Sequence, residues 1–217
     1  YNFIFAFAAV CNFITYLAFP SRKKLYYFFL CFMFCFAAFR WEVGCDWDGY
    51  RIHAESYGPL PFEQVRKFGE QGYWLLVLAI NRIGWLYPTI NIFACLVFFA
   101  GVNALARRQP DPLLYLTLAF PILITGIAMS AVRQEFAIGI ICYAFIAFAE
   151  NKLFRYVLFV GVAALFHKSA AAFLMFVPYL LPISRNYRII TVIVALPIVV
   201  LMGASDTASG YAEMYIG

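Results

Sequence analysis

Three short groups of polar residues interrupt an otherwise apolar sequence, and each contains side chains that can bind anions or transfer protons. They are FRWEVGCDWDGYR (residues 39–51), SAVRQE (130–135) and FHKSA (166–170). The arginine guanidinium binds phosphate through two hydrogen bonds and keeps its proton. The histidine imidazole titrates near neutral pH and can accept a proton from a hydroxyl. These residue types favour an anion site beside a general base.

The two basic candidates also have structural interpretations. An arginine within a bilayer costs about 2.5–3.5 kcal/mol, so Arg133 could remain at the membrane interface or form an ion pair with Glu135 or Asp46. His167 alone could be a structural histidine, but its polar neighbours in FHKSA fit a functional role equally well. Both interpretations stay open at this point.

The aspartates of the DWDG sequence, Asp46 and Asp48, raise the question of a metal ion. A calcium loop needs glutamate at its twelfth position, but the residue at that place counted from Asp46 is Tyr57. An acidic pair that binds a divalent ion for sugar transfer is a second interpretation. Turn and helix-cap residues before a short helix are a third. We predict no metal site and no cofactor.

The composition places these groups in a membrane protein. The 217 residues are 65% hydrophobic, 20% aromatic and 12% charged, with a mean hydropathy of +0.82, whereas soluble domains carry about 25% charged residues. The net charge is +5, but the basic residues form short clusters between apolar runs. This pattern is typical of cytoplasmic loops and not of a nucleic-acid-binding face. Nucleotide-binding, zinc-protease and CxxC redox motifs are absent.

A spanning helix needs roughly 20 apolar residues, and fewer when its ends snorkel; the sequence contains about eight candidate runs. They cover residues 2–19, 25–40, 88–106, 112–129, 131–149, 153–166, 169–183 and 188–204. Basic loops follow the first, third, fifth and seventh runs, which predicts that these loops are cytoplasmic. We therefore expect an all-α, polytopic transmembrane helix bundle. It would form a single domain over residues 1–217, as a fragment of a longer chain.

The long segment 40–87 is predicted to be an outer loop that contains an interfacial helix. Its last part, 72–88, has apolar residues at helical spacing, but the apolar run is too short to cross a bilayer and contains Asn81 and Arg82. With this topology, all three polar groups reach the outer boundary of the membrane.

The polar motifs resemble, in order, those of the EpsG-like branch of the Wzy-type polysaccharide polymerases. RWEVGCDWDGY (residues 40–50) resembles the signature R-x-x-x-G-x-D-x-x-x-Y, and EQGYWLL (70–76) resembles E-x-G-[FY]. VRQEFA (132–137) resembles R-Q-x-x-A, and FHKSA resembles H-x-S. The resemblance covers about residues 1–205.

This resemblance implies the fold of membrane-embedded C-type glycosyltransferases. It also implies transfer of a growing glycan from undecaprenyl diphosphate to another lipid-linked repeat unit, in O-antigen, capsule or exopolysaccharide synthesis. The site would face the periplasm or the outside of the bacterial cytoplasmic (inner) membrane. The expected partners are lipid-linked oligosaccharides, membrane lipids and a chain-length regulator protein, with no nucleic acid.

The resemblance and the residue chemistry together assign roles. Asp46, Arg133 and His167 are predicted to be catalytic, with Arg133 on the diphosphate and either His167 or Asp46 accepting the proton of the acceptor hydroxyl. The predicted substrate-binding residues are Arg40, Trp47, Tyr50, Gln134, Lys168 and Ser169. Among these, Arg40 would bind the diphosphate together with Arg133, and Gln134 and Lys168 would assist. Trp47 and Tyr50 would stack on sugar rings.

Two other functions stay open. A flippase or transporter of lipid-linked sugars would tend to place charge at the membrane midplane, whereas here charge collects at one boundary. A metal-dependent C-type glycosyltransferase that uses a lipid-phosphate sugar donor would need the acidic pair of the DWDG sequence.

Overall fold

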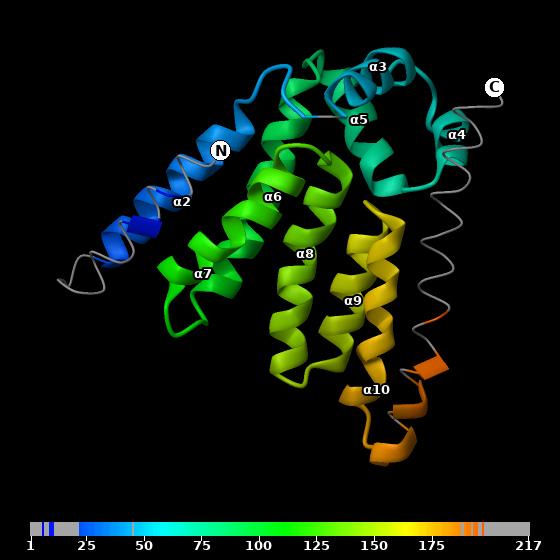
Figure 1. The fold of residues 1–217 in the computed structure, drawn as a ribbon. Coiled ribbons are helices and arrows are strands. Elements are labelled where there is room, and N and C mark those ends of the chain that lie inside the picture. Colours follow the sequence, from blue (N-terminus) through cyan, green and yellow to red (C-terminus); the bar gives the residue numbers. More distant parts are fainter. Residues whose placement is uncertain are drawn as a thin grey trace.

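The helical character of the chain is plain in the computed structural model (Figure 1). The structure describes residues 22–44, 46–187 and a few positions near the termini (6, 9, 10, 189–191, 193, 194 and 197). Within these residues every element is a helix and none is a strand. The predicted all-α class is therefore confirmed.

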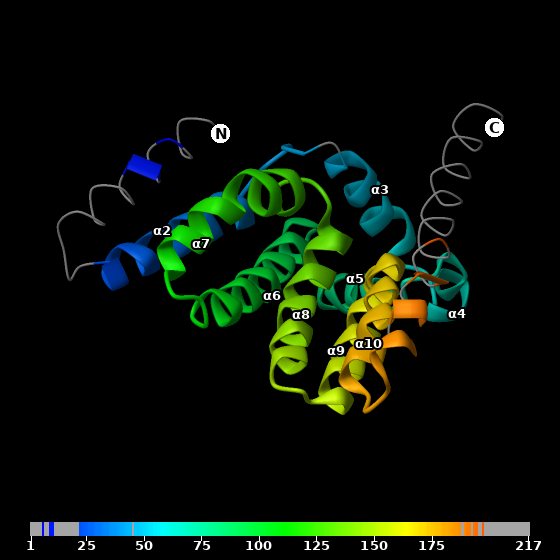
Figure 2. The ribbon, with the colours of Figure 1, turned by 60° about the horizontal axis from the view of Figure 1, so that its bottom comes forward.

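Five helices form the body of the structure: α2 (Arg22–Ala38), α6 (Pro88–Ala106), α7 (Pro112–Ala119), α8 (Val132–Ala149) and α9 (Leu153–Ala164). A π-helix, Phe120–Ala128, continues α7, and a 3₁₀ helix, Lys168–Phe176, leads into α10 (Val177–Leu180). Figure 2 shows α2 and α7 on one side of α6, and α8 and α9 on the other.

The centre of the body is the crossing of α6 and α8, where two glycines meet. A Cβ atom added at Gly101 would lie 2.0 Å from the carbonyl oxygen of Gly139, and one added at Gly139 would lie 2.6 Å from the carbonyl oxygen of Val97. Small residues of this kind allow helix backbones to approach closely in a membrane, where dispersion contacts drive helix packing. The crossing therefore depends on the absence of side chains at both positions.

The predicted run 112–129 is one continuous apolar helix, Pro112–Ala128, that changes type at Phe120. Pro121 cannot donate a backbone hydrogen bond, and its ring crowds the preceding turn. From this point the helix widens, and Met129 N bonds to Ile124 O, five residues back, at 3.0 Å. The threonine hydroxyl of Thr125 donates to Pro121 O at 2.6 Å.

Two helices in the described part of the chain are long and apolar enough to cross a membrane, α6 and α8. The predicted bundle of eight spans is not confirmed. Run 25–40 corresponds to α2, and run 153–166 to α9, whose 12 residues extend only about 18 Å. Run 169–183 is a 3₁₀ helix followed by α10. Runs 2–19 and 188–204 lie almost entirely outside the described residues.

Ion pairs connect the basic loops at one end of the body. Arg22, at the start of α2, pairs with Asp111, whose side chain also caps α7 through Leu114 N at 3.1 Å. Arg108 pairs with Glu150 at 2.7 Å, which joins the loop after α6 to the loop after α8. Three of the loops predicted to be cytoplasmic therefore lie together.

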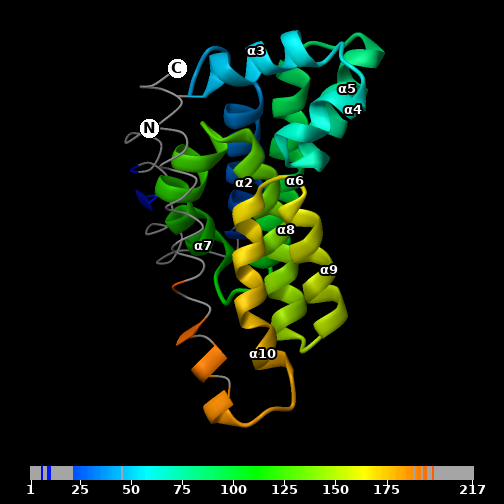
Figure 3. The same cartoon turned by 90° about the vertical axis from the view of Figure 1, so that its right-hand side faces the viewer.

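The segment 39–87 covers the opposite end of the body. It contains α3 (Trp47–Tyr57), α4 (Phe62–Val65), a 3₁₀ turn (Arg66–Phe68) and α5 (Gln71–Ile83). Figure 3 shows α3, α4 and α5 above α6 and α8, with α10 at the far end. The helix predicted in 72–88 is α5, which ends at Gly84 in the left-handed conformation. The segment therefore brings the first polar group close to the start of α8.

Candidate functional site

Glu70 is the hub of a polar site where three elements meet. It lies at the N-terminus of α5, and its carboxylate is 5% exposed. The carboxylate pairs with Arg133 Nη1, lies 2.8 Å from His167 Nδ1 and accepts the backbone N–H of Lys168 at 3.2 Å. One carboxylate thus connects α5, the first turn of α8 and the junction after α9.

The backbone around Glu70 is held in an uncommon conformation. Its φ of +46° lies in the left-handed region, which a non-glycine residue adopts at a cost of roughly 1–2 kcal/mol. Gly72 N donates to Leu165 O at 2.9 Å, which ties α5 to the end of α9. The backbone after Glu70 is therefore fixed by Leu165, and the carboxylate of Glu70 is fixed by Arg133 and His167. These contacts hold the strained residue in place.

The Arg133 guanidinium is positioned by tyrosines as well as by Glu70. Its Nε donates to the hydroxyl of Tyr50 at 3.3 Å, and its Cζ lies 5.5 Å from the ring centroid of Tyr50 and 5.8 Å from that of Tyr73. Such contacts favour a cation over the ring face. The third nitrogen, Nη2, has no hydrogen-bond partner among the described residues, and the side chain is 33% exposed. Arg133 can therefore bind a further anion.

His167 has one ring nitrogen held and one available. Because Nδ1 contacts the Glu70 carboxylate, a neutral imidazole carries its proton on Nδ1 and presents Nε2 as the acceptor. The Nε2 atom has no partner within the described part of the chain, and the side chain is 23% exposed. A carboxylate–imidazole pair of this kind supplies a positioned general base.

The charges of the site change the pKa of Glu70 itself and that of a neighbouring histidine. Burial alone would raise the pKa of Glu70, but the hydrogen bond from His167 and the charge of Arg133 bring this pKa below its ordinary value. Burial and the same arginine charge lower the pKa of His53, on α3. Glu70 is therefore ionised and His53 neutral at neutral pH.

The sequence profile of the EpsG family matches residues 23–216, nearly the whole chain. The chain belongs to the EpsG family. Membership of the EpsG family and the two long apolar helices indicate a membrane protein of polysaccharide biosynthesis. No match to the chain was found among curated proteins or among solved structures.

The structure brings several predicted site residues of this EpsG-family chain to one place. Arg133 and His167 contact the Glu70 carboxylate, and Lys168 joins them through its backbone N–H. Tyr50 contacts Arg133. Gln134, His167 and Ser169 line a pocket of about 240 Å³ on the adjoining surface. Two motifs about 35 residues apart in sequence, around 133 and 167, therefore form one surface with the hub residue.

Arg40 lies apart from this site, in the interior. Its side chain is 6% exposed, and its Nε and Nη1 have no hydrogen-bond partner among the described residues. Its charge acts on Glu135, which is fully buried, and on Tyr87. Residues 133 and 135 point about 200° apart on a helix, so Glu135 faces the interior while Arg133 faces Glu70. An ion pair of Arg133 with Glu135 or Asp46 is one structural interpretation of the sequence; the partner of Arg133 is instead Glu70.

The remaining residues of the first polar group lie at the start of α3. Asp46 precedes the helix, is exposed and makes no side-chain capping hydrogen bond, and Asp48 pairs with Arg51 at 3.2 Å. Trp47 and Tyr50 are 3% and 5% exposed. Among the described residues, no three acidic, histidine or cysteine side chains gather as a metal site would require.

Sequence reasoning placed Glu70 in a motif but gave it no role. The residue precedes an amphipathic helix, where an acidic residue is usually a helix cap, so its type alone does not distinguish it. Two local signals were available in EQGY: the glycine, which contacts Leu165, and the aromatic residue Tyr73, which lies against Arg133. Their significance depends on contacts with residues far along the chain.

Proposed function

We propose that this chain is a polysaccharide polymerase, a glycosyltransferase that joins oligosaccharide repeat units linked to undecaprenyl diphosphate. The observation that carries the proposal is the shared contact of Arg133 and His167 with Glu70. It combines an anion-binding cation with a positioned base, the two groups that this transfer needs. Membership of the EpsG family supports the same reaction class.

The leaving group in this reaction is a lipid-bound diphosphate. Arg133 has Nη2 available, and its planar guanidinium matches the geometry of phosphate oxygens. Lys168 and Gln134 are exposed beside it and assist in binding. The negative charge that develops on the diphosphate as the glycosidic carbon–oxygen bond breaks is thereby stabilised.

The acceptor is a sugar hydroxyl of a second lipid-linked repeat. Its oxygen bonds to the anomeric carbon of the donor, while its proton moves to Nε2 of His167. The resulting imidazolium is stabilised by the ionised Glu70 carboxylate at Nδ1. Asp46, exposed at the start of α3, is the second candidate for the base. Ser169 lines the same pocket as His167 and contributes a hydroxyl for the acceptor.

The two ends of the body support the proposed orientation. The basic loops joined by the Arg22 and Arg108 ion pairs lie at the end opposite the Glu70 site. With these loops in the cytoplasm, the site faces the outer side of the bacterial cytoplasmic membrane. Lipid-linked repeats, membrane lipids and a chain-length regulator protein are its proposed partners.

A strain that lacks the gene and is complemented with variants tests the function. Without the gene, long glycan chains should disappear while single lipid-linked repeats accumulate on the outer side, and the wild-type chain should restore long chains. Glu63→Gln, on the exposed Glu63–Arg66 pair, should restore them equally. Single repeats retained on the cytoplasmic side would identify a flippase instead. Long chains without the gene would exclude the proposed reaction.

A further inference from the structure

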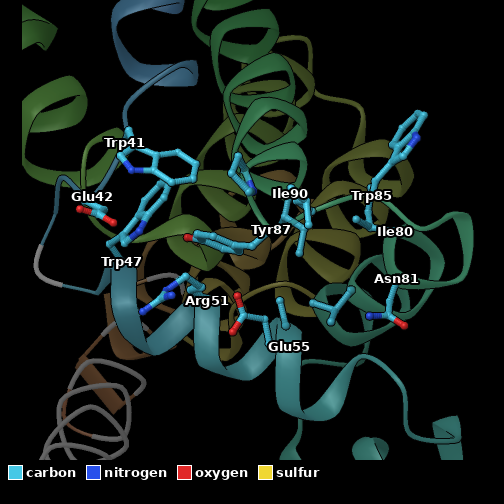
Figure 4. Close-up of a pocket in the computed structure, with 14 residues that line it drawn as sticks. Trp41, Glu42, Trp47, Arg51, Glu55, Ile80, Asn81, Trp85, Tyr87 and Ile90 are labelled. Carbon is cyan, nitrogen blue, oxygen red and sulfur yellow. The ribbon is translucent and has the colours of Figure 1, made fainter.

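A second pocket, lined by aromatic side chains, lies between α3, α5 and the start of α6 (Figure 4). The rings of Trp41, Trp47 and Tyr87 form a continuous series, with centroids 5.8 Å apart for the first pair and 4.9 Å for the second. Trp47 and Tyr87 are buried, whereas Trp41 is 63% exposed and Trp85, across the pocket, is 50% exposed. The exposed indole of Trp41 therefore lies beside a fixed aromatic floor, and that of Trp85 extends from the opposite edge of the pocket.

The size of the pocket suits one ring. Its volume is about 200 Å³, below the roughly 300–1,000 Å³ of sites for drug-sized ligands. Tryptophan combines an apolar face with an N–H donor, which matches the C–H faces and the hydroxyls of a sugar. The buried Nε1 of Trp47 has no hydrogen-bond partner among the described residues, so a donor in this lining lacks an acceptor.

Polar side chains surround the aromatic lining. Glu42, Arg51, Glu55 and Asn81 line the pocket (Figure 4). The two carboxylates have no hydrogen bond or ion pair within the described part of the chain, while Arg51 is partly neutralised by Asp48. The rim of the pocket therefore carries two carboxylates, Glu42 and Glu55, and one guanidinium, that of Arg51, which also pairs with Asp48. The rim is acidic. This rim accepts hydrogen bonds from hydroxyl groups and repels phosphate or carboxylate groups.

The backbone that carries Trp41 and Glu42 is held in place at some cost. Glu42 has φ +52°, in the left-handed region, which costs a non-glycine residue roughly 1–2 kcal/mol. Gly44, with φ +111°, packs so closely that an added Cβ would lie 2.3 Å from Met129 O. Strain of this kind persists at ligand sites because the surrounding structure fixes it.

The pocket and the Glu70 site share two helices. Tyr50, which contacts Arg133, and Arg51, which lines the pocket, are consecutive residues of α3. Glu70 begins α5, and Asn81 lies near its end, a rise of about 16 Å along the helix. A glycan that reaches from one site to the other contains more than one sugar ring.

We propose that the pocket lined by Trp41, Trp85, Glu42 and Glu55 is a sugar subsite that binds an uncharged ring of the glycan, away from the bond being formed. The inference rests on the proposed function for the identity of the glycan. The cationic site takes the diphosphate end of the substrate, and the acidic aromatic pocket takes a neutral ring. The alternative is that the two exposed tryptophans contact lipid headgroups at the membrane interface.

Binding of a phosphate-free sugar separates these alternatives. The probe is the repeat oligosaccharide released from its lipid diphosphate by mild acid, titrated by calorimetry against the full chain in lipid nanodiscs. The double variant Trp41→Ala/Trp85→Ala should weaken binding about tenfold or more. Both side chains are largely exposed, so the fold should persist. Phe39→Ala, also exposed (67%) and outside the pocket, is the matched control and should bind as wild type does.

The outcomes distinguish this inference from the proposed function. Arg133→Lys should leave binding of the phosphate-free probe unchanged, because Arg133 contacts the diphosphate. Equal binding by the double tryptophan variant and wild type would overturn the subsite and assign both side chains to the lipid interface, even where polymerisation is intact. Tryptophan-dependent binding by a chain that never lengthens glycans would support the subsite and reject the polymerase.

A carboxylated form of the probe tests the charge selectivity of the pocket. It should bind more weakly than the uncharged probe, and Glu42→Gln/Glu55→Gln should remove that difference. Tighter binding of the carboxylated form would overturn the charge selectivity.

Discussion

Glu70 and His167 are 97 positions apart in the sequence, yet the Glu70 Oε1 atom lies 2.8 Å from His167 Nδ1. The same carboxylate pairs with Arg133, so one side chain orients both the proposed base and the proposed diphosphate ligand. Its removal should affect both roles together.

Replacement of Glu70 by glutamine keeps the shape of the side chain but removes its charge. We expect Glu70→Gln to lower kcat by about 100-fold or more, because the imidazolium loses its counter-charge and Arg133 loses its partner. Chain elongation by purified protein with lipid-linked repeats measures this loss. The matched variant Glu63→Gln should retain wild-type kcat, and a Glu70→Gln variant with wild-type kcat would contradict the hub role.

The lowered pKa of Glu70 predicts how stability depends on pH. A carboxyl whose pKa is lower in the folded state stabilises the fold above its unfolded pKa of about 4.3, and this contribution disappears as pH falls through the folded-state value. Thermal unfolding of wild type should therefore lose more stability between neutral and acidic pH than unfolding of Glu70→Gln. Parallel curves for the two proteins would show that the ion pair contributes nothing.

His167 should control the pH dependence of the reaction. In His167→Gln, kcat should fall by about 10²–10⁴, the usual contribution of a general base. The residual activity should lose the acidic limb of the pH–rate profile, because the variant has no imidazole to act as the base. A pH–rate profile of both proteins measures the change. An unchanged acidic limb in His167→Gln would transfer the role of base to Asp46.

Arg133→Lys keeps the positive charge but loses the planar fork and the contacts with Tyr50 and Glu70. We expect KM for the diphosphate-linked substrate to rise by about tenfold, with a further decrease in kcat. The exposed Arg66, which pairs with Glu63, provides the control substitution Arg66→Lys, which should leave both constants unchanged. Equal constants for Arg133→Lys and wild type would mean that charge alone suffices.

The α6–α8 crossing should not accept a methyl group. The new Cβ of Gly139→Ala would lie 2.6 Å from Val97 O, so the helices must separate, at a cost of about 1–3 kcal/mol. Gly161→Ala, on α9, meets nothing within 4 Å and should leave stability unchanged or slightly raise it. Thermal unfolding in detergent compares the two. Equal melting temperatures would contradict the close crossing.

The pattern of apolar residues along the sequence predicted several of the helices well. The run 88–106 coincides with α6, 131–149 agrees with α8 to within one residue, and the helix expected in 72–88 is α5. The pattern was less informative after residue 166, because an apolar run does not distinguish a 3₁₀ helix from an α-helix. It also gave no indication of the change of helix type at Phe120.

The site was only partly predictable, because its connections are long-range. Arg133 and His167 were selected by their chemistry, and the structure brings them together. Arg40, selected in the same way, is buried near Glu135 instead. The residue that joins the site, Glu70, has a left-handed backbone and partners 63 and 97 positions away. No local sequence pattern encodes these two facts.

The contact of Gly101 with Gly139 limits which sequences can adopt this fold. Each position faces backbone atoms of the other helix, so a change at one cannot be offset by a smaller residue at the other. In a library randomised at both positions, functional clones should therefore retain glycine at both. Exposed apolar positions such as Leu118 and Phe154, which are 63% and 79% exposed, should instead accept many apolar residues.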